Sequence, residues 1–264
     1  MRVVLLASSL HGTAAHHLPA LLASGCCEVA MVVLSEGRPA NKRRYYRRKL
    51  RKLFSIGPFG TLNGMRMRNW YRTHAGGPAL DALCVAHHIP FHVTPGINTD
   101  RTRALFRMAA ADLGISLGNG YIAPSVFTIP TFGMINIHHE LLPDYQNAPS
   151  VIWQLYNGSA ITGYTIHKID KRIDTGKILL QERMPVQFGS CLKDTVKGSM
   201  RALLEASSKG LVQVLCNFSG YFNQAKPQGP GKSYTTPSLW QFLKIRRNHR
   251  LLAGMEGIRS KRSG

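Results

Sequence analysis

Short apolar runs alternate with segments of helical spacing through the first 140 residues, and this alternation limits the folds open to the chain. Apolar runs of strand length lie at residues 2–7, 28–35, 90–94 and 114–117. Helical patterns follow them at residues 13–24, 79–87 and 100–113. Strands that alternate with helices build a mostly parallel sheet with helices on its faces. The sequence therefore predicts an α/β fold in which ligands bind beyond the carboxyl ends of the strands.

Residues 133–176 hold the polar residues that most favour a chemical role. Residues 134–138 alternate as a buried strand does, and a period of two would point Asn136 and His138 to the same side. Pro143 ends this strand, because proline has no N–H for the ladder. The sequence therefore predicts two polar side chains that share one face at the end of a strand.

The chain after this strand can bring a carboxylate back to the same place. A helix is predicted over 149–156 and a strand over 163–170, and Asp174 opens a tight turn after it. A carboxylate near an imidazole favours its protonated form, and an amide N–H can donate to an oxyanion. Taken singly, Asn136 could satisfy backbone groups, His138 could be a core residue and Asp174 a turn residue. Their combination favours acyl transfer.

The order of these residues resembles the folate-dependent formyltransferase family. The shared motifs are Asn136-x-His138, Leu141-Leu142-Pro143, Gly163-x-x-x-His167 and Asp174-Thr175-Gly176. The resemblance is clearest over 112–186, has weak support in the first 35 residues, and does not extend to the basic segments. The family includes glycinamide ribonucleotide formyltransferase, methionyl-tRNA formyltransferase and the sugar N-formyltransferases. Many relatives have Arg-Gly where this chain has Gln146-Asn147, a departure that concerns the acceptor contacts and not the chemistry.

The resemblance implies the formyltransferase version of the α/β fold and transfer of a formyl group from 10-formyltetrahydrofolate to a primary amine. It implies that Asn136 donates to the developing oxyanion and that His138 helps to stabilise that charge and to move protons. Asp174 would support His138 electrostatically and take the amine proton through water. The resemblance implies no metal.

Two binding regions are also implied by the resemblance. In relatives, backbone groups in the loops after the strands hold the pterin end of the folate. The cofactor candidates are therefore Gly118, Asn119, Gly120, Tyr121, Ile122, Leu141, Leu142, Pro143 and Asp144. A plain turn is the competing interpretation of the glycines. Relatives hold the acceptor near the first loop, where the candidates are Ser8, Ser9, His11 and Gly12. We expect His16 and His17 on the surface of the first helix.

The formal net charge of +21 is concentrated in two segments. Residues 37–80 contain 12 Lys or Arg and no Asp or Glu, and residues 241–264 contain seven against one. The rest of the chain carries only +3. Charge placed in this way is informative about partners more than about fold.

The first basic segment contains an amphipathic helix. Over 44–54, apolar residues recur at helical spacing among basic ones. The candidates for acceptor contacts are Arg43, Arg44, Arg47 and Arg48. The helix would contact phosphates of a nucleotide, of RNA or of an anionic membrane surface. The alternative is a solvated face whose long side chains pack over the edge of the core.

The domain prediction is a catalytic domain over 1–220, with the basic insert at 37–75, and a basic extension over 221–264. The five cysteines are odd in number and lack C-x-x-C spacing, which indicates neither a disulfide framework nor a zinc site. A reducing cytoplasm is the predicted location. The sequence has no apolar run near the roughly 20 residues that span a bilayer, so we expect neither secretion nor membrane insertion.

The acceptor predicted from the sequence is an amino-sugar nucleotide or another phosphorylated amine. Methionyl-tRNA formyltransferases also carry a basic insert after the second strand, but they usually add a carboxyl-terminal β-barrel domain. Only 49 residues follow the long helix predicted over 194–215, which we take as too few for that barrel. A methionyl-tRNA formyltransferase without the barrel is one alternative. A non-catalytic RNA-binding or membrane-surface protein that keeps the fold is another.

Overall fold

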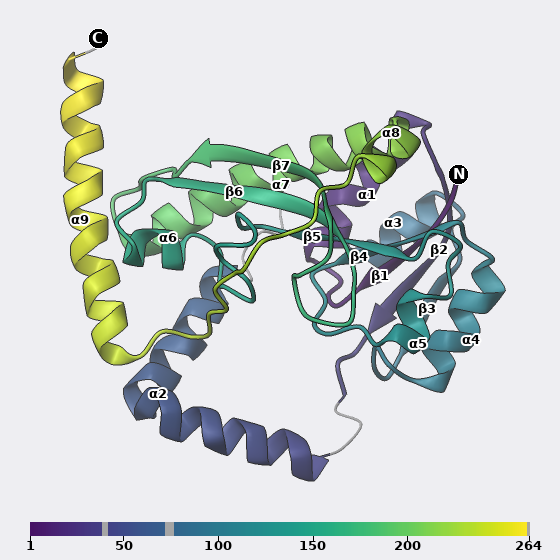
Figure 1. Ribbon diagram of the computed structural model, residues 1–264, viewed down its shortest axis with the longest axis horizontal. Helices are drawn as coiled ribbons and strands as arrows, with labels where there is room; N and C mark the ends of the chain where they lie inside the picture. The colour runs from purple at the N-terminus through teal and green to yellow at the C-terminus, as the bar shows by residue number, and fades with distance from the viewer. Residues whose placement is uncertain (39–41, 72–76, 263–264) are drawn as a thin grey trace.

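The computed structural model describes residues 1–38, 42–71 and 77–262, which form a seven-stranded sheet with helices on both faces (Figure 1). The strands are β1 (Arg2–Ala7), β2 (Glu28–Ser35), β3 (Phe91–Thr94), β4 (Leu113–Leu117), β5 (Met134–His138), β6 (Ile161–Lys168) and β7 (Ile178–Pro185). Their order in the sheet is β3-β2-β1-β4-β5-β6-β7. The pairs from β3 to β5 are parallel, whereas β5–β6 and β6–β7 are antiparallel. The predicted mostly parallel α/β sheet is confirmed.

Burial on both faces explains why the central strands are apolar throughout. In β1, Val3 and Leu5 point into the core cluster that includes α1, α3 and α7, and Val4 and Leu6 point into the cluster under α4 and α5. The helices outside the two basic segments are α1 (Thr13–Ser24), α3 (Leu80–Ala86), α4 (Asp100–Ala109), α5 (Pro124–Phe127), α6 (Ile152–Tyr156), α7 (Leu192–Cys216) and α8 (Phe218–Asn223). The short helices α5 and α8 were not predicted, and α6 is shorter than expected because the loop before it passes through Val151 at φ 70°.

The sheet changes direction between β1 and β4. The chain moves outward on one side through β2 and β3, and on the other through β5. Such a reversal opens a crevice at the carboxyl ends of the two central strands. The loops after these strands meet there, because Ser8 Oγ donates a 2.5 Å hydrogen bond to the carbonyl of Gly118. The topology thus places the loop after β1, which contains Ser8, beside the loop at 118–122 after β4, called the glycine loop below.

The basic insert folds as α2 (Lys42–Tyr71), which is bent at Gly57. Gly57 has φ 72°, a conformation that favours glycine, and Pro58 follows it. The helix is therefore interrupted near the middle of the insert. Figure 1 shows the first half of α2 projecting from the body of the molecule. The last helix, α9 (Leu239–Arg262), packs against α6 and α2, so both basic segments meet on one side of the protein.

His17 corrects the expectation that both histidines of α1 lie on its surface. Its side chain is fully buried, Nδ1 donates to the carbonyl of Thr13 at 2.8 Å, and Nε2 lies 3.0 Å from Ser207 Oγ of α7. Burial lowers the pKa of His17 to about 4, despite its hydrogen bond to Thr13. The ring is therefore neutral at pH 7 and joins α1 to α7.

Among the described helices, none combines the length and the apolar character that a bilayer span requires.

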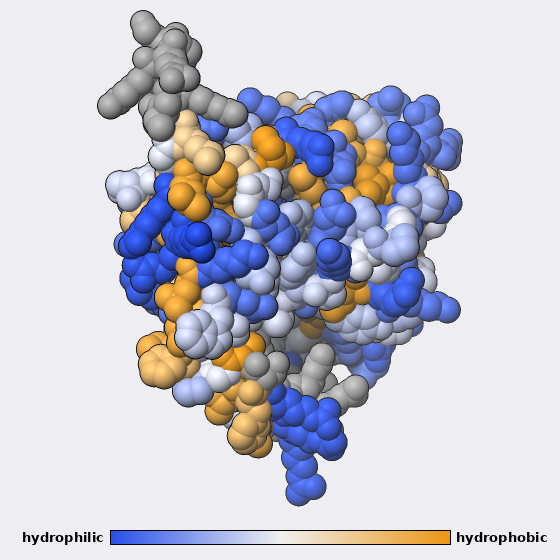
Figure 2. Space-filling model, turned by 60° about the vertical axis from the view of Figure 1, so that its left-hand side comes forward, coloured by the Kyte–Doolittle hydropathy of each residue, from blue (hydrophilic) through white to orange (hydrophobic). Residues whose placement is uncertain are grey.

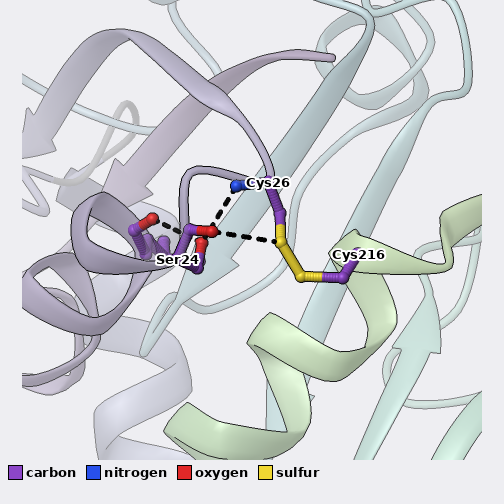
Figure 3. The surroundings of a disulfide bond; sticks show 4 residues. Ser24, Cys26 and Cys216 are labelled. Atoms are coloured by element: carbon purple, nitrogen blue, oxygen red, sulfur yellow. Dashed lines mark hydrogen bonds between the residues drawn. A yellow bond between two sulfur atoms is a disulfide. The ribbon is translucent and has the colours of Figure 1, made fainter.

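A disulfide bond between Cys26 and Cys216 was not expected from the sequence (Figure 3). The two cysteines are 190 residues apart, yet their Cα atoms lie 5.0 Å apart where α1 and α7 end side by side. Spacing along the chain gives no signal of such a pair. Disulfides persist mainly in oxidising compartments. The cysteine pattern therefore no longer supports a reducing compartment, and the cytoplasmic location stays a prediction.

Removing this bond should destabilise the protein measurably. Closing so long a loop restricts the unfolded chain, and typical disulfides contribute about 2–4 kcal/mol. We expect Cys216→Ser to lower the free energy of unfolding by that amount in a denaturant titration without reductant. Cys27→Ser is the matched control, because Cys27 is the adjacent free cysteine. Identical unfolding midpoints for the parent and Cys216→Ser would show that the bond does not form in solution.

Candidate active site

Two neighbouring polar residues of β5 line a cavity of about 290 Å³ at the carboxyl edge of the sheet. Asn136 and His138 line it, while Ile135 and Ile137, which alternate with them along the strand, are buried in the core. The cavity is bounded by the loop after β4, the loop after β5 and the loop between β6 and β7. The period-two prediction for this strand is confirmed.

His138 has a defined tautomer in this cavity. Its Nε2 lies 2.8 Å from the carbonyl oxygen of Tyr145, which can only accept, so Nε2 carries the proton. The other ring nitrogen, Nδ1, faces Asp174 Oδ2 at 3.8 Å. Burial lowers the pKa of His138, and this effect outweighs the rise caused by the carboxylate of Asp174. At pH 7 the ring is neutral and presents an acceptor nitrogen to the cavity.

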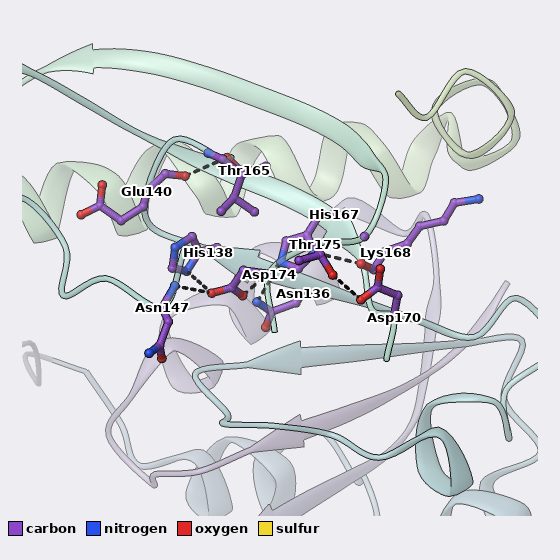
Figure 4. A network of polar contacts seen from close by, with 12 residues as sticks. Asn136, His138, Glu140, Asn147, Thr165, His167, Lys168, Asp170, Asp174 and Thr175 are labelled. Carbon is purple, nitrogen blue, oxygen red and sulfur yellow. Dashed lines mark hydrogen bonds and ion pairs between the residues drawn. The ribbon is translucent and has the colours of Figure 1, made fainter. Parts of the chain in front are cut away.

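Asp174 returns to β5 from the β6–β7 loop, as the sequence indicated (Figure 4). Its Oδ2 accepts a 2.8 Å hydrogen bond from the backbone N–H of Asn147, and its Oδ1 lies 3.6 Å from His167 Nε2. Burial alone would raise the pKa of this carboxyl. The His167 and His138 rings and the Asn147 N–H reverse that effect and lower the pKa to about 2. Asp174 is therefore ionised at pH 7.

The loop that carries Asp174 is fixed by its own hydrogen bonds. Asp170 Oδ1 accepts from Thr175 Oγ1 at 2.6 Å and from the backbone N–H of Arg172 at 2.9 Å. Gly176 packs directly against the carbonyl of Lys168, where a Cβ atom would not fit. Asp174 itself has φ 57°, which aspartate adopts more readily than most residues. The loop therefore holds the carboxylate in place before any ligand binds.

His167 orients Asn136, a role that sequence reasoning missed. The two residues are direct partners in the antiparallel pairing of β5 and β6. His167 Nδ1 lies 2.9 Å from the carbonyl oxygen of Lys168, to which it donates, and Nε2 lies 3.2 Å from the amide nitrogen Nδ2 of Asn136. The second hydrogen on that amide nitrogen remains for a ligand. The sequence did hold a signal for this role, because His167 belongs to the family motif and stands at a fixed spacing from Asp174.

Asn147 is the second residue that was missed. It stands where many relatives have glycine, and it adopts φ 53°, a left-handed conformation that asparagine tolerates. Its backbone N–H holds Asp174, and its side-chain Nδ2 donates to the carbonyl of Tyr234 at 3.0 Å. The departure from Arg-Gly therefore falls directly beside the carboxylate of Asp174.

The glycine loop at 118–122 lines the same cavity, as expected of a cofactor loop. Gly118 has φ 78°, so a side chain there would be strained. Asn119 Nδ2 donates to the carbonyl of Leu6 at 2.6 Å, which fixes the amide. Its Oδ1 is buried and has no partner among the described residues. A buried acceptor without a donor is costly, and a ring N–H of a bound ligand would satisfy it.

The other cofactor candidates lie outside the cavity. Leu141 and Leu142 are buried, and neither they nor Pro143 and Asp144 line it. The Leu142–Pro143 peptide bond is cis. These four residues shape the turn after β5, and their contact with a folate stays a prediction. Among the residues that the structure describes, no three His, Cys, Asp or Glu side chains are grouped to hold a metal ion.

The acceptor candidates fall into two groups. Ser8 contacts the glycine loop, and the adjacent turn holds His11 through a 3.3 Å hydrogen bond from its N–H to Ser9 Oγ, with Gly12 beside it. On α2, Arg43 and Arg47 are exposed, whereas the side chains of Arg44 and Arg48 lie outside the described residues. The six candidates whose side chains are described do not line the cavity, so their role in acceptor binding stays a prediction.

The end of α2 is nevertheless tied to the cavity. Tyr71, its last residue, donates a 2.7 Å hydrogen bond from its hydroxyl to the carbonyl of Ser150, which lines the cavity. Glu140 Oε1 accepts a 2.7 Å hydrogen bond from the N–H of Val151. Glu140 is fully buried, and burial raises the pKa of its carboxyl well above the ordinary value. The insert and a buried glutamate thus position the same loop.

Comparison with known proteins agrees with this geometry. Residues 96–215 match the family model described as formyl transferase. Over 143 residues the chain is 35% identical to a methionyl-tRNA formyltransferase of Koribacter versatilis, covering 54% of this chain and 45% of that protein. The chain thus spans less than half the length of that relative. The match to the family model includes every residue that lines the cavity, and it excludes α2 and α9.

Solved structures share the fold. Glycinamide ribonucleotide transformylase 1 from Symbiobacterium toebii superposes with a TM-score of 0.54 at 19% identity, covering 83% of this chain and 88% of that one. WlaRD, a sugar 3N-formyltransferase solved in the presence of dTDP and 5-N-formyl-tetrahydrofolate, gives a TM-score of 0.56 at 16% identity, covering 94% and 79%. The matched segment contains Asn136, His138 and Asp174, so over residues 96–215 the chain is similar to the formyltransferase family.

Proposed function

We propose that this protein transfers the formyl group of 10-formyltetrahydrofolate to a primary amine on a phosphate-bearing acceptor. The observation that carries the proposal is a single cavity lined by Asn136, His138 and Asp174 together with the glycine loop 118–122. Its volume of about 290 Å³ lies near the lower end of ligand pockets, roughly 300–1,000 Å³, and suits the reacting part of a larger molecule.

The side chains divide the chemistry between them. Bound 10-formyltetrahydrofolate supplies an activated formyl group. Asn136 donates its second amide hydrogen to the negative charge that develops on the formyl oxygen. His138, neutral at pH 7, accepts a proton from the attacking amine at Nδ1, directly or through water. Asp174, ionised 3.8 Å from that atom, stabilises the imidazolium that results. His138 then returns the proton to the folate nitrogen as the bond between that nitrogen and the formyl carbon breaks, so that tetrahydrofolate leaves.

The first candidate acceptor is an amino-sugar nucleotide. Two observations support it. The insert carries 12 basic residues and no acidic ones over 37–80, and α2 is tied through Tyr71 to the loop that lines the cavity. The fold of a sugar 3N-formyltransferase covers 94% of this chain, which takes in nearly all of its elements. A phosphate-bearing acceptor would be drawn to the positive field of the insert.

The second candidate acceptor is methionyl-tRNA. It is favoured by the 35% identity to a methionyl-tRNA formyltransferase over 143 residues. A basic, partly apolar insert also suits contact with RNA, whose phosphates and bases require charge and stacking surface. A non-catalytic relict is disfavoured, because its site would have no need of an ionised carboxylate held beside a neutral imidazole.

An acceptor screen tests the proposal. Purified protein and 10-formyltetrahydrofolate are incubated with amino-sugar nucleotides, the corresponding free amino sugars, glycinamide ribonucleotide and methionyl-tRNA, and kcat/KM is measured for each. We expect an amino-sugar nucleotide to be the best substrate and its free amino sugar to be at least about tenfold poorer, because charge-assisted contacts are lost. A preference for methionyl-tRNA would establish the second candidate. Folate-analogue binding without formylation of any amine would contradict the proposed activity.

A further inference from the structure

A second cavity, of about 350 Å³, lies where the two basic segments meet α7. It is formed by the end of α2, the beginning of α7 and the middle of α9. The lining residues are Arg66, Trp70, Ser190, Cys191, Leu192, Lys193, Phe242, Arg246, His249 and Arg250. It shares no residue with the catalytic cavity. Figure 2 turns this side of the molecule forward and shows a strongly hydrophilic patch next to hydrophobic surface.

The charge of this cavity is of one sign. Four of its side chains are Lys or Arg, and none is Asp or Glu. None of the four takes part in an ion pair among the residues that the structure describes. The carboxylate of Asp194 lies close to Lys193, and it accepts hydrogen bonds from Ser190 Oγ at 2.8 Å and Cys191 Sγ at 3.0 Å. Cations that converge on one cavity focus a field that attracts an anion.

The start of α7 adds to this field. A helix of 25 residues begins at Leu192, and no side chain caps its first turn. The backbone N–H groups of that turn and the helix dipole favour negative charge at this end. Because Ser190, Cys191 and Lys193 lie in the lining, the helix end opens into the cavity. The field of the four cations and that of the helix therefore act on the same volume.

An aromatic floor accompanies the charge. The rings of Trp70 and Phe242 lie with centroids 6.4 Å apart and planes inclined by 38°, and only 5% and 6% of these residues are exposed. The guanidinium of Arg66 lies 6.0 Å from the Trp70 ring centroid. The parts of these two rings that reach the cavity give the planar base of a ligand an apolar contact beside the cations.

His249 also lines this cavity, together with the aromatic rings and the Lys and Arg side chains. It is 6% exposed, and its Nε2 lies 2.7 Å from Thr195 Oγ1, which also accepts from the N–H of Gly189 at 2.8 Å. Burial lowers the pKa of His249, and the charge of Arg250 lowers it further. The ring is therefore neutral at pH 7, and Nδ1 is the nitrogen left to contact a ligand. The positive charge of the cavity comes from its Lys and Arg side chains.

We propose that this cavity binds a nucleoside phosphate, with the phosphates among Lys193, Arg246 and Arg250 and the base against Trp70 and Phe242. A volume of about 350 Å³ is at the small end of ligand pockets, which suits a single nucleotide. The site is additional to the formyl-transfer cavity. It does not depend on the identity of the acceptor there.

Calorimetric titration of the full chain with ADP, without a formyl donor, tests this site. We expect Arg246→Gln to raise the dissociation constant of ADP about tenfold, since one charge-assisted contact to phosphate is lost. Arg247→Gln is the matched control, because the adjacent arginine is exposed on α9 and does not line the cavity. Its dissociation constant should stay within about twofold of the parent value. Asn136→Ala should bind ADP as the parent does, which separates this site from the catalytic cavity.

Two further probes divide the ligand into its parts. Adenosine, which lacks the phosphates, and inorganic pyrophosphate, which lacks the base, should each bind at least about tenfold more weakly than ADP. Equal binding of adenosine and ADP would overturn the role of the cations. Equal binding of pyrophosphate and ADP would overturn the nucleoside. Failure of ADP to bind, or equal losses in Arg246→Gln and Arg247→Gln, would overturn the site.

Discussion

Asn136→Ala, His138→Ala and Asp174→Ala should each lower the rate of formyl transfer at least about a hundredfold, because loss of one oxyanion donor typically costs roughly 10² to 10³ in rate. The three side chains line one cavity, and His138 and Asp174 are 3.8 Å apart. When catalytic side chains act as a unit, replacing any one of them already removes most of the rate enhancement that they provide together. The triple variant should therefore be little slower than the slowest single variant when kcat is compared on the same acceptor.

Asp174→Asn separates charge from loop geometry. The amide keeps an oxygen for the Asn147 N–H but loses the charge that faces His138, so we expect a loss close to that of Asp174→Ala. His92→Ala is the control for a histidine outside the cavity, on the edge strand β3, and it should leave kcat unchanged. Thermal unfolding of each variant checks that the fold is retained. A folded single variant with activity within about tenfold of the parent would remove that residue from the mechanism.

Replacing Arg43, Arg44, Arg47 and Arg48 with Gln should raise the KM of the acceptor about tenfold or more and leave folate binding unchanged. The insert has no acidic residues over 37–80, so its field is not neutralised locally. The contact from Tyr71 to Ser150 fixes the insert beside the cavity, while the folate candidates 118–122 lie on another loop. Acceptor KM and the dissociation constant of a folate analogue are measured as functions of salt.

The salt dependence also ranks the two acceptors. Each neutralised phosphate contributes roughly 0.9 to the logarithmic slope for duplex nucleic acid and roughly 0.7 for a single strand. A tRNA would therefore give a steep slope, and a nucleotide-sugar with two phosphates a shallow one. The exposed pair Arg101→Gln and Arg107→Gln on α4 is the control for loss of charge elsewhere. An unchanged KM and slope in the insert variant would leave α2 without a role in recognition.

The sequence predicted the parts of the fold and site that depend on local periodicity. In β5 the alternation places Ile135 and Ile137 in the core, and this forces Asn136 and His138 to the other side. Asp174 could be placed because a turn follows β6, and the family resemblance gave the order of the motifs. Gly25 ends α1 and Gly57 bends α2, and both adopt a positive φ, which glycine allows without strain.

What the sequence could not supply depends on contacts between distant residues. The Asn147 N–H holds Asp174 from 27 residues away, and Cys26 meets Cys216 across 190 residues. His17 looked like a surface residue because nothing local shows that α7 covers it. The second cavity is built from α2, α7 and α9, and more than 100 residues of chain separate α2 from α7, so its cations look like an ordinary basic surface in the sequence.

The most direct test of the account follows the formyl group itself. The protein is mixed with 10-formyltetrahydrofolate that carries an isotope label on the formyl carbon, together with an amino-sugar nucleotide, and the label is traced by nuclear magnetic resonance. We expect the label to move into a formamide on the acceptor with the parent protein, and at least about a hundredfold more slowly with Asn136→Ala. Label that stays on the folate, or that appears as free formate at the same rate in both proteins, would contradict it.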